Sequence, residues 1–186
     1  ARRGPMSMSQ AVASVLQACE ALAEAHAAGI VHRDLKLSNL FVASYPDGQP
    51  CIKVLDFGIS KYSIPGSDPD LSMTGTAAVM GSPLYMSPEQ MRSTRNVDGR
   101  SDIWALGIIL YEMLAGTRPF RGSSSAETLA AIIRDEPESL AAKAPCVPVP
   151  VRVVVERCLA KEPRERYDST RDLARELEAW RLHASE

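Results

Sequence analysis

Apolar residues recur every three or four positions over several segments of the chain, which is the spacing of one face of an α-helix. The first such segment covers residues 9–28, where Ser7 and Gln10 resemble a capping box and Gly29 follows the last apolar position. The same spacing predicts four later helices, over residues 102–115, 124–134, 149–160 and 169–183. We therefore expect a mostly helical chain.

Two short apolar segments interrupt the helical pattern, at residues 40–42 and 52–55. Residues 45–50 between them contain the turn residues Pro, Asp and Gly, so the pair predicts a small β-hairpin. Residues 61–87 are rich in Ser, Thr, Gly and Pro and lack periodicity, which predicts a long loop of the kind that is usually functional. The expected fold class is mainly α (α+β), a helical bundle with a small β-hairpin.

The composition is that of a globular domain. Of the 186 residues, 45% are apolar, and 21 basic residues nearly balance 23 acidic ones to give a net charge of −2. This balance argues against a nucleic-acid-binding or membrane-binding surface. The longest apolar stretch, around residues 103–114, is too short to span a membrane, and no signal peptide is recognisable. We expect no membrane span and a cytoplasmic location.

The four cysteines give no sign of a disulfide framework or a zinc site. They are Cys19, Cys51, Cys146 and Cys158, and no two of them form a CxxC pair. Reduced thiols, as in the cytoplasm, are the expected state.

One short stretch carries the residue types that phosphoryl transfer requires. Residues 32–39 are HRDLKLSN, and DFG follows at residues 56–58. The reaction needs a carboxylate to accept the hydrogen bond of the incoming hydroxyl, a cation at the phosphate, and oxygen ligands for Mg²⁺. The side chains suited to these tasks are those of Asp34, Lys36, Asn39 and Asp56. They lie on segments that flank the predicted hairpin, so they can converge.

These residues match the protein-kinase signature H-R-D-L-x-x-x-N followed by D-F-G. Residues 87–89, which are SPE, resemble the A-P-E motif of the same family. Asp102, Trp104 and Gly107 match its D-x-W-x-x-G pattern. With its motifs in this order, the chain resembles the C-terminal lobe of a bacterial eukaryotic-like (Hanks-type) Ser/Thr protein kinase.

The resemblance implies a partial kinase domain over residues 1–186, from helix E to helix I, with the catalytic loop at 32–39 and the activation segment at 56–89. It implies ATP and Mg²⁺ as cofactors and proteins bearing Ser or Thr as substrates. No G-x-G-x-x-G occurs in the sequence, so the N-lobe that covers ATP is expected to be absent. The chain begins with Ala1, which is consistent with a start inside a longer protein.

The resemblance also assigns roles near the two motifs. Asp34 resembles the catalytic base, and Lys36 resembles the phosphate-contacting lysine that marks Ser/Thr kinases. Asn39 and Asp56 resemble the metal ligands. Phe41 matches the position that floors the adenine pocket, although an ordinary core aromatic would also explain it.

Activation and substrate positioning are implied at five further residues. Arg33 and Lys61 match the basic pocket that binds a phosphate on the activation loop. Thr74 and Thr76 are the candidate phosphorylation sites, with a plain polar loop as the alternative. Ser82 resembles the hydroxyl residue of the substrate-positioning loop.

Structural roles are implied for the remaining motif residues. His32 is expected to pack on Phe57 in the core rather than to transfer protons. Asp102 resembles a buried anchor for the catalytic-loop backbone, and the simpler role of a helix N-cap is compatible with that assignment. Glu89 and Arg166 are predicted to form an ion pair, and solvated surface charges are the alternative.

The leading function is therefore a signalling enzyme that transfers the γ-phosphoryl group of ATP to Ser or Thr of proteins. Without the missing N-lobe as a partner, the fragment is expected to be weak or inactive, and longer relatives of this family are often membrane-anchored. The alternative is a non-catalytic, kinase-like interaction module. A small-molecule phosphotransferase is disfavoured because those enzymes resemble H-G-D rather than the HRD at residues 32–34.

Overall fold

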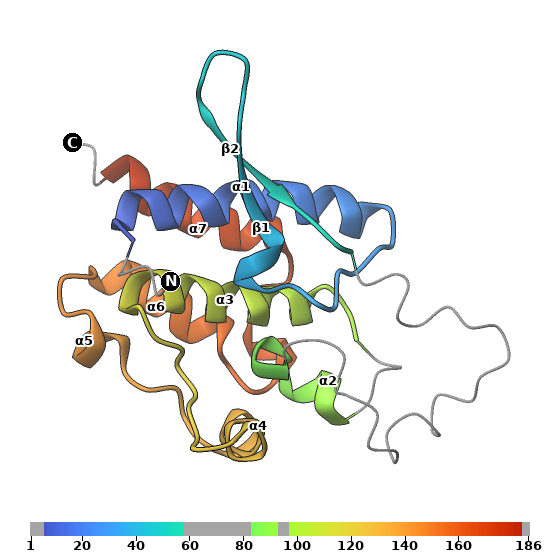
Figure 1. The fold of residues 1–186 in the computed structure, drawn as a ribbon, viewed down its shortest axis with the longest axis vertical. Coiled ribbons are helices and arrows are strands. Elements are labelled where there is room, and N and C mark those ends of the chain that lie inside the picture. The colour runs from blue at the N-terminus through green and yellow to red at the C-terminus, as the bar shows by residue number, and fades with distance from the viewer. Residues whose placement is uncertain (1–5, 58–82, 93–96, 184–186) are drawn as a thin grey trace, which may run out of the picture.

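The computed structural model of the chain describes residues 6–57, 83–92 and 97–183. These residues form a helical bundle with one β-hairpin that projects from it (Figure 1). The helices and strands are α1 (Met8–Ala27), η1 (Leu37–Asn39), β1 (Leu40–Ser44), β2 (Pro50–Val54), η4 (Pro83–Tyr85), α2 (Pro88–Arg92), α3 (Arg100–Ala115), α4 (Ser125–Arg134), α5 (Leu140–Lys143), α6 (Val149–Cys158), η5 (Pro163–Glu165) and α7 (Thr170–His183). The predicted mainly helical fold with a hairpin is confirmed.

Helix α3 is the centre of the core. Its residues are buried without interruption from Ser101 to Tyr111, because the apolar side chains cover all of its faces. Helices α1 and α6 pack directly on it, and α7 packs on both of these helices (Figure 1). The close packing of α6 on α3 depends on Gly107, where an added Cβ would lie 2.6 Å from the Cβ of Cys158.

The long first helix begins and ends within one residue of its predicted bounds. The Ser7 side chain accepts a hydrogen bond from the N–H of Gln10 at 3.4 Å. The Ser7 hydroxyl in turn donates to the side-chain oxygen of Gln10, so only one half of a capping box is present. The helix ends before Gly29, whose φ of +74° lies in the left-handed region that glycine adopts readily.

The predicted hairpin is also present. β1 and β2 pair antiparallel with Val42 opposite Ile52, and Gly48 in the turn has a φ of +84°. The N–H of Ile52 donates to the side-chain oxygen of Gln17 at 2.8 Å, which fastens the hairpin to α1. Because β1 begins directly after Asn39, the hairpin lies beside the end of the loop that carries the HRD motif.

The later helices differ from the predictions mainly at their ends. Ser124 caps α4 by accepting the N–H of Glu127 at 3.2 Å, while α6 ends two residues earlier than predicted. Helices α2 and α5 were not predicted individually, because five and four residues are too few to show a helical period. Within the described residues, no helix is both long and apolar enough to cross a bilayer.

Candidate functional site

The segment that carries the HRD motif is fixed to the core by Asp102. One carboxylate oxygen accepts the backbone N–H of His32 at 2.9 Å, and the other accepts that of Arg33 at 3.0 Å. Asp102 is only 1% exposed, so these bonds replace the water that a buried carboxylate loses. It lies in the first turn of α3, whose N-cap is Gly99, so the simpler N-cap role for Asp102 is wrong.

The backbone is strained in both motifs. Arg33 has a φ of +64° and Asp56 a φ of +56°. Residues other than glycine rarely adopt such angles, and each costs about 1–3 kcal/mol unless the surroundings hold it in place. Strain of this kind is concentrated at functional sites, and here both strained residues belong to the segments that the sequence singled out.

Three of the four predicted phosphoryl-transfer residues contact one another. The Lys36 ammonium lies 3.3 Å from a carboxylate oxygen of Asp34, and the Asn39 amide nitrogen donates to the backbone oxygen of Asp34 at 3.1 Å. The backbone oxygen of Asn39 accepts the N–H of Leu55 at 2.9 Å. That bond brings Asp56, the next residue, to the same end of the hairpin. Asp56 is exposed, while Asn39 is buried.

His32 and Phe57 pack as expected. Their ring centroids lie 4.7 Å apart, and His32 is fully buried. Phe41, by contrast, is 56% exposed, which excludes the alternative that it is an ordinary core aromatic.

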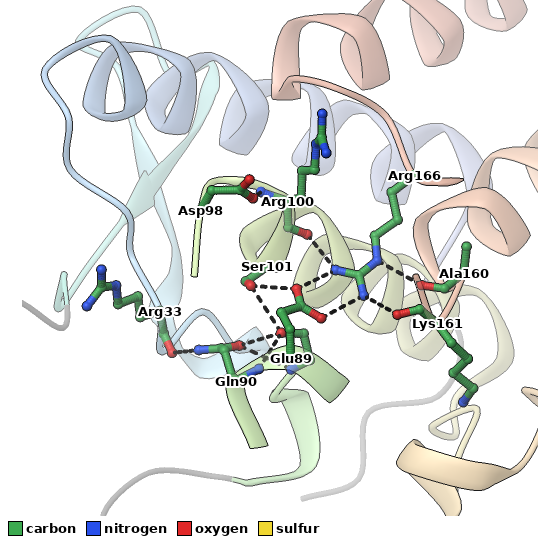
Figure 2. A network of polar contacts seen from close by, with 10 residues as sticks. Arg33, Glu89, Gln90, Asp98, Arg100, Ser101, Ala160, Lys161 and Arg166 are labelled. Atoms are coloured by element: carbon green, nitrogen blue, oxygen red, sulfur yellow. Dashed lines mark hydrogen bonds and ion pairs between the residues drawn. The ribbon is translucent and has the colours of Figure 1, made fainter. Parts of the chain in front are cut away.

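The predicted ion pair between Glu89 and Arg166 is present at the centre of a polar network (Figure 2). Arg166 donates to both carboxylate oxygens at 2.7 and 2.8 Å, and the Ser101 hydroxyl donates to one of them at 2.7 Å. Burial by itself raises the pKa of Glu89, but the hydrogen bonds and charge of Arg166 and the bond from Ser101 outweigh it, so the pKa is lowered. The two charges are therefore not solvated surface charges.

Two contacts in this region were not predicted. His26, in the last turn of α1, places Nε2 at 2.7 Å from a carboxylate oxygen of Asp102. Gln90, in α2, donates to the backbone oxygen of Arg33 at 2.8 Å (Figure 2). Each of these side chains acts on a residue far away in the sequence, so no local pattern indicates it.

Four predicted site residues lie outside the described part of the chain, namely Lys61, Thr74, Thr76 and Ser82. Most of the predicted loop at residues 61–87 lies there too, and its described end forms the 3₁₀ turn η4. Across residues 6–57, 83–92 and 97–183, no group of three or more His, Cys, Asp or Glu is arranged to hold a metal ion.

The chain is similar to known proteins over most of its length. Residues 1–177 match the family described as Protein kinase domain. The chain is 41% identical over 165 residues to the serine/threonine-protein kinase Pkn1 of Myxococcus xanthus, which covers 89% of this chain and 23% of that protein. It is 37% identical over 174 residues to the serine/threonine-protein kinase PknB of Mycobacterium tuberculosis, covering 94% of this chain and 26% of PknB. The chain thus spans about a quarter of the length of these relatives.

Proposed function

Because the chain belongs to the protein kinase family, we propose that it carries the phosphoryl-transfer centre of a serine/threonine protein kinase. ATP is the proposed phosphate donor, and Ser or Thr hydroxyls of proteins are the acceptors. The observation that carries the proposal is the set of contacts among Asp34, Lys36 and Asn39, with Asp56 one residue beyond Leu55. The names of the relatives Pkn1 and PknB support the same activity.

Asp34 and Lys36 are the proposed catalytic pair. In this proposal the Asp34 carboxylate accepts the hydrogen bond of the incoming hydroxyl, and the Lys36 ammonium neutralises charge on the transferred phosphate. The 3.3 Å contact between them supports action at a single point, since one carboxylate oxygen and the cation already face each other. Both side chains are partly exposed, so a substrate can reach them.

Asn39 and Asp56 are the proposed protein ligands of Mg²⁺. The amide nitrogen of Asn39 is committed to the backbone oxygen of Asp34, so its side-chain oxygen is the atom that can face a cation. When bound, Mg²⁺ would neutralise charge on the phosphates. A pair of oxygen ligands fits this ion, because Mg²⁺ in kinases takes its other ligands from phosphates and water.

We propose that exposed apolar side chains at the base of the hairpin form the surface that faces the nucleotide. Phe41 and Leu55 are 56% and 40% exposed, and the strand register places them on the same face of the hairpin. We infer that Phe41 floors the adenine site, and that the described residues form the C-terminal lobe of a kinase domain. A separate N-lobe would then cover this surface.

Regulation by phosphorylation is proposed for Thr74 and Thr76, with Arg33 and Lys61 as the cations that bind the phosphate and Ser82 as the hydroxyl that positions the substrate. The support for Arg33 is the fixed backbone from which its side chain extends, since its N–H is bonded to Asp102. The other assignments rest on the sequence motifs.

The test is phosphate transfer from radiolabelled ATP and Mg²⁺ to a mixed Ser/Thr protein substrate, with the chain alone and with the N-lobe of PknB supplied as a second polypeptide. We expect transfer in the second case, and we expect Asp34→Asn to lower it by about a thousandfold, within the range for loss of an essential catalytic group. Transfer that is unchanged in Asp34→Asn, or absent with both polypeptides present, would contradict the proposal.

A non-catalytic interaction module is the second candidate, and the exposed hairpin favours it. Tyr45 is 52% exposed beyond the base of the hairpin, where no nucleotide contact is proposed. For a module of this kind, the chain would bind the added N-lobe with no phosphate transfer by the wild-type chain. Binding measured by isothermal titration beside the transfer assay separates the two functions.

A further inference from the structure

Gln90 lies in α2, directly after Glu89, and its side chain reaches across to the loop that carries the HRD motif (Figure 2). Its amide nitrogen donates to the backbone oxygen of Arg33 at 2.8 Å, and its side-chain oxygen accepts the N–H of Ser87 at 3.1 Å. The orientation of the amide is fixed, because a carbonyl can only accept and a backbone N–H can only donate. The Gln90 side chain thus joins Ser87 to Arg33 through two hydrogen bonds whose donors and acceptors are fixed.

The residue that receives this bond is strained. Arg33 has a φ of +64°, an angle that persists only when the surroundings determine it. Its N–H donates to Asp102 in α3, and its carbonyl oxygen accepts from Gln90 in α2. Both backbone polar atoms of Arg33 are therefore held by side chains, and each side chain comes from a different helix.

The bond also acts on the next residue. The carbonyl of Arg33 and the N–H of Asp34 belong to one rigid peptide plane. Gln90 holds the oxygen side of this plane, and His32 Nδ1 accepts the N–H on its other side at 3.3 Å. Rotation of the plane would turn the Asp34 carboxylate away from Lys36, so the orientation of Asp34 depends on both contacts.

We propose that Gln90 is a positioning residue, which fixes the peptide plane before Asp34 and thereby ties the orientation of the proposed catalytic carboxylate to the placement of α2. The role in catalysis rests on the proposed function, whereas the effect on the peptide plane does not. Helix α2 is itself held by the ion pair of Glu89 with Arg166 and by the bond from Ser101. The contacts thus run without a gap from Arg166 through α2 to Asp34.

The sharpest variant is Gln90→Glu. It keeps an oxygen that can accept the N–H of Ser87, but it presents a second oxygen to the carbonyl of Arg33, where both atoms can only accept. Gln90→Met keeps the length of the side chain and removes both bonds. Arg92→Ala, on the exposed end of the same helix, is the matched control.

The first measurement is hydrogen exchange of the Asp34 amide in the full chain, with the amides of α3 as the reference for global unfolding. We expect the Asp34 amide to exchange about tenfold faster in Gln90→Glu and Gln90→Met, as loss of one hydrogen bond implies, with α3 unchanged. Arg92→Ala is expected to match the wild type. Unchanged Asp34 exchange in both variants would overturn the proposal, whether or not the chain transfers phosphate.

The second measurement uses phosphate transfer with the N-lobe supplied. We expect kcat to fall about tenfold in both variants while KM for ATP is unchanged, because the side chain that moves does not bind the nucleotide. In Gln90→Glu the introduced carboxyl group can donate a hydrogen bond once it is protonated, so the activity of this variant relative to wild type is expected to recover as the pH falls from about 6 toward about 4.3, the ordinary pKa of a glutamate. The activity of Gln90→Met relative to wild type is expected to stay constant across this pH range. A constant ratio in both variants would contradict the role of the Gln90 amide as hydrogen-bond donor.

Discussion

Nε2 of His32 lies 2.9 Å from the backbone oxygen of Leu55, and this contact joins the loop of Asp34 to the residue before Asp56. The other ring nitrogen, Nδ1, accepts the N–H of Asp34 at 3.3 Å. The carbonyl requires a proton on Nε2 and the N–H requires a lone pair on Nδ1, so this geometry specifies one neutral tautomer. His32 therefore holds the two motifs together and has no ring nitrogen left for proton transfer.

Replacement of His32 by Phe is expected to destabilise the chain, because it keeps the packing on Phe57 but leaves the oxygen of Leu55 and the N–H of Asp34 without their partner. We expect the free energy of unfolding to fall by about 1–3 kcal/mol, measured by urea denaturation. His183→Ala, at an exposed site near the end of α7, serves as the control and is expected to change little. A His32→Phe chain as stable as the wild type would show that these two bonds do not matter.

The ion pair of Glu89 and Arg166 is expected to be essential for stability, because the Arg166 side chain is fully buried. Glu89→Gln leaves that guanidinium without a compensating charge. We expect the free energy of unfolding, measured by urea denaturation, to fall by about 3–5 kcal/mol. The control is Asp168→Asn, which removes an ion pair with Arg100 in which the aspartate is 78% exposed. An exposed pair contributes about 0–1 kcal/mol, so similar losses in the two variants would contradict this prediction.

The same ion pair predicts a pH dependence. The pKa of Glu89 is lower in the fold than in the unfolded chain, so its contribution is complete above the unfolded value of about 4.3 and is lost as pH falls through the folded value. Thermal melts of wild type and Glu89→Gln between about pH 3 and about pH 6 are expected to converge at the acidic end. A constant difference in melting temperature would exclude this linkage.

Gly99→Ala is expected to disturb the contact between His26 and Asp102. The backbone of Gly99 has a φ of −59°, which alanine tolerates, but an added Cβ would lie 2.7 Å from two ring atoms of His26. The His26 ring must then move, and we expect the free energy of unfolding, measured by urea denaturation, to fall by about 1–3 kcal/mol. In a His26→Ala background the same substitution is expected to cost much less, so the double-mutant cycle should show strong coupling. Additive effects would mean that the ring moves aside without cost.

The elements that were predicted correctly have local signals. The helix at residues 9–28 has a cap, a repeating apolar face and a glycine at its end, and the hairpin has turn residues between two apolar segments. The cluster of Asp34, Lys36 and Asn39 was predicted because its spacing lies within a single short motif.

The contacts that were missed join distant positions. His26 and Asp102 are 76 residues apart, and Gln90 and Arg33 are 57 residues apart. A histidine or a glutamine at a helix surface has no periodicity that would reveal such a partner, since only the packing of the helices brings the two together. The pair of Glu89 and Arg166, 77 residues apart, was predicted only because the resemblance supplied it.

Lys161 provides a test of how burial changes the pKa of a lysine in this fold. Its ammonium donates to the backbone oxygen of Ile132 at 2.8 Å and lies 4.1 Å from the centre of the Phe120 ring. Burial lowers the pKa of Lys161 to about 8, although the nearby carboxylates of Glu136 and Asp135 oppose the shift. The fold therefore disfavours the charged form of this lysine, compared with the unfolded chain.

The sign of the resulting pH dependence follows from which state holds the proton. Above about pH 8 the folded chain loses the Lys161 proton while the unfolded chain keeps it up to about pH 10.4, so stability rises with pH across this window. Measured by urea denaturation, the free energy of unfolding is expected to rise more between about pH 7.5 and about pH 9.5 for the wild type than for Lys161→Met. Lys143→Met, at a more exposed lysine paired with Glu138, is the control variant. Parallel curves for wild type and Lys161→Met would show that burial does not shift this lysine.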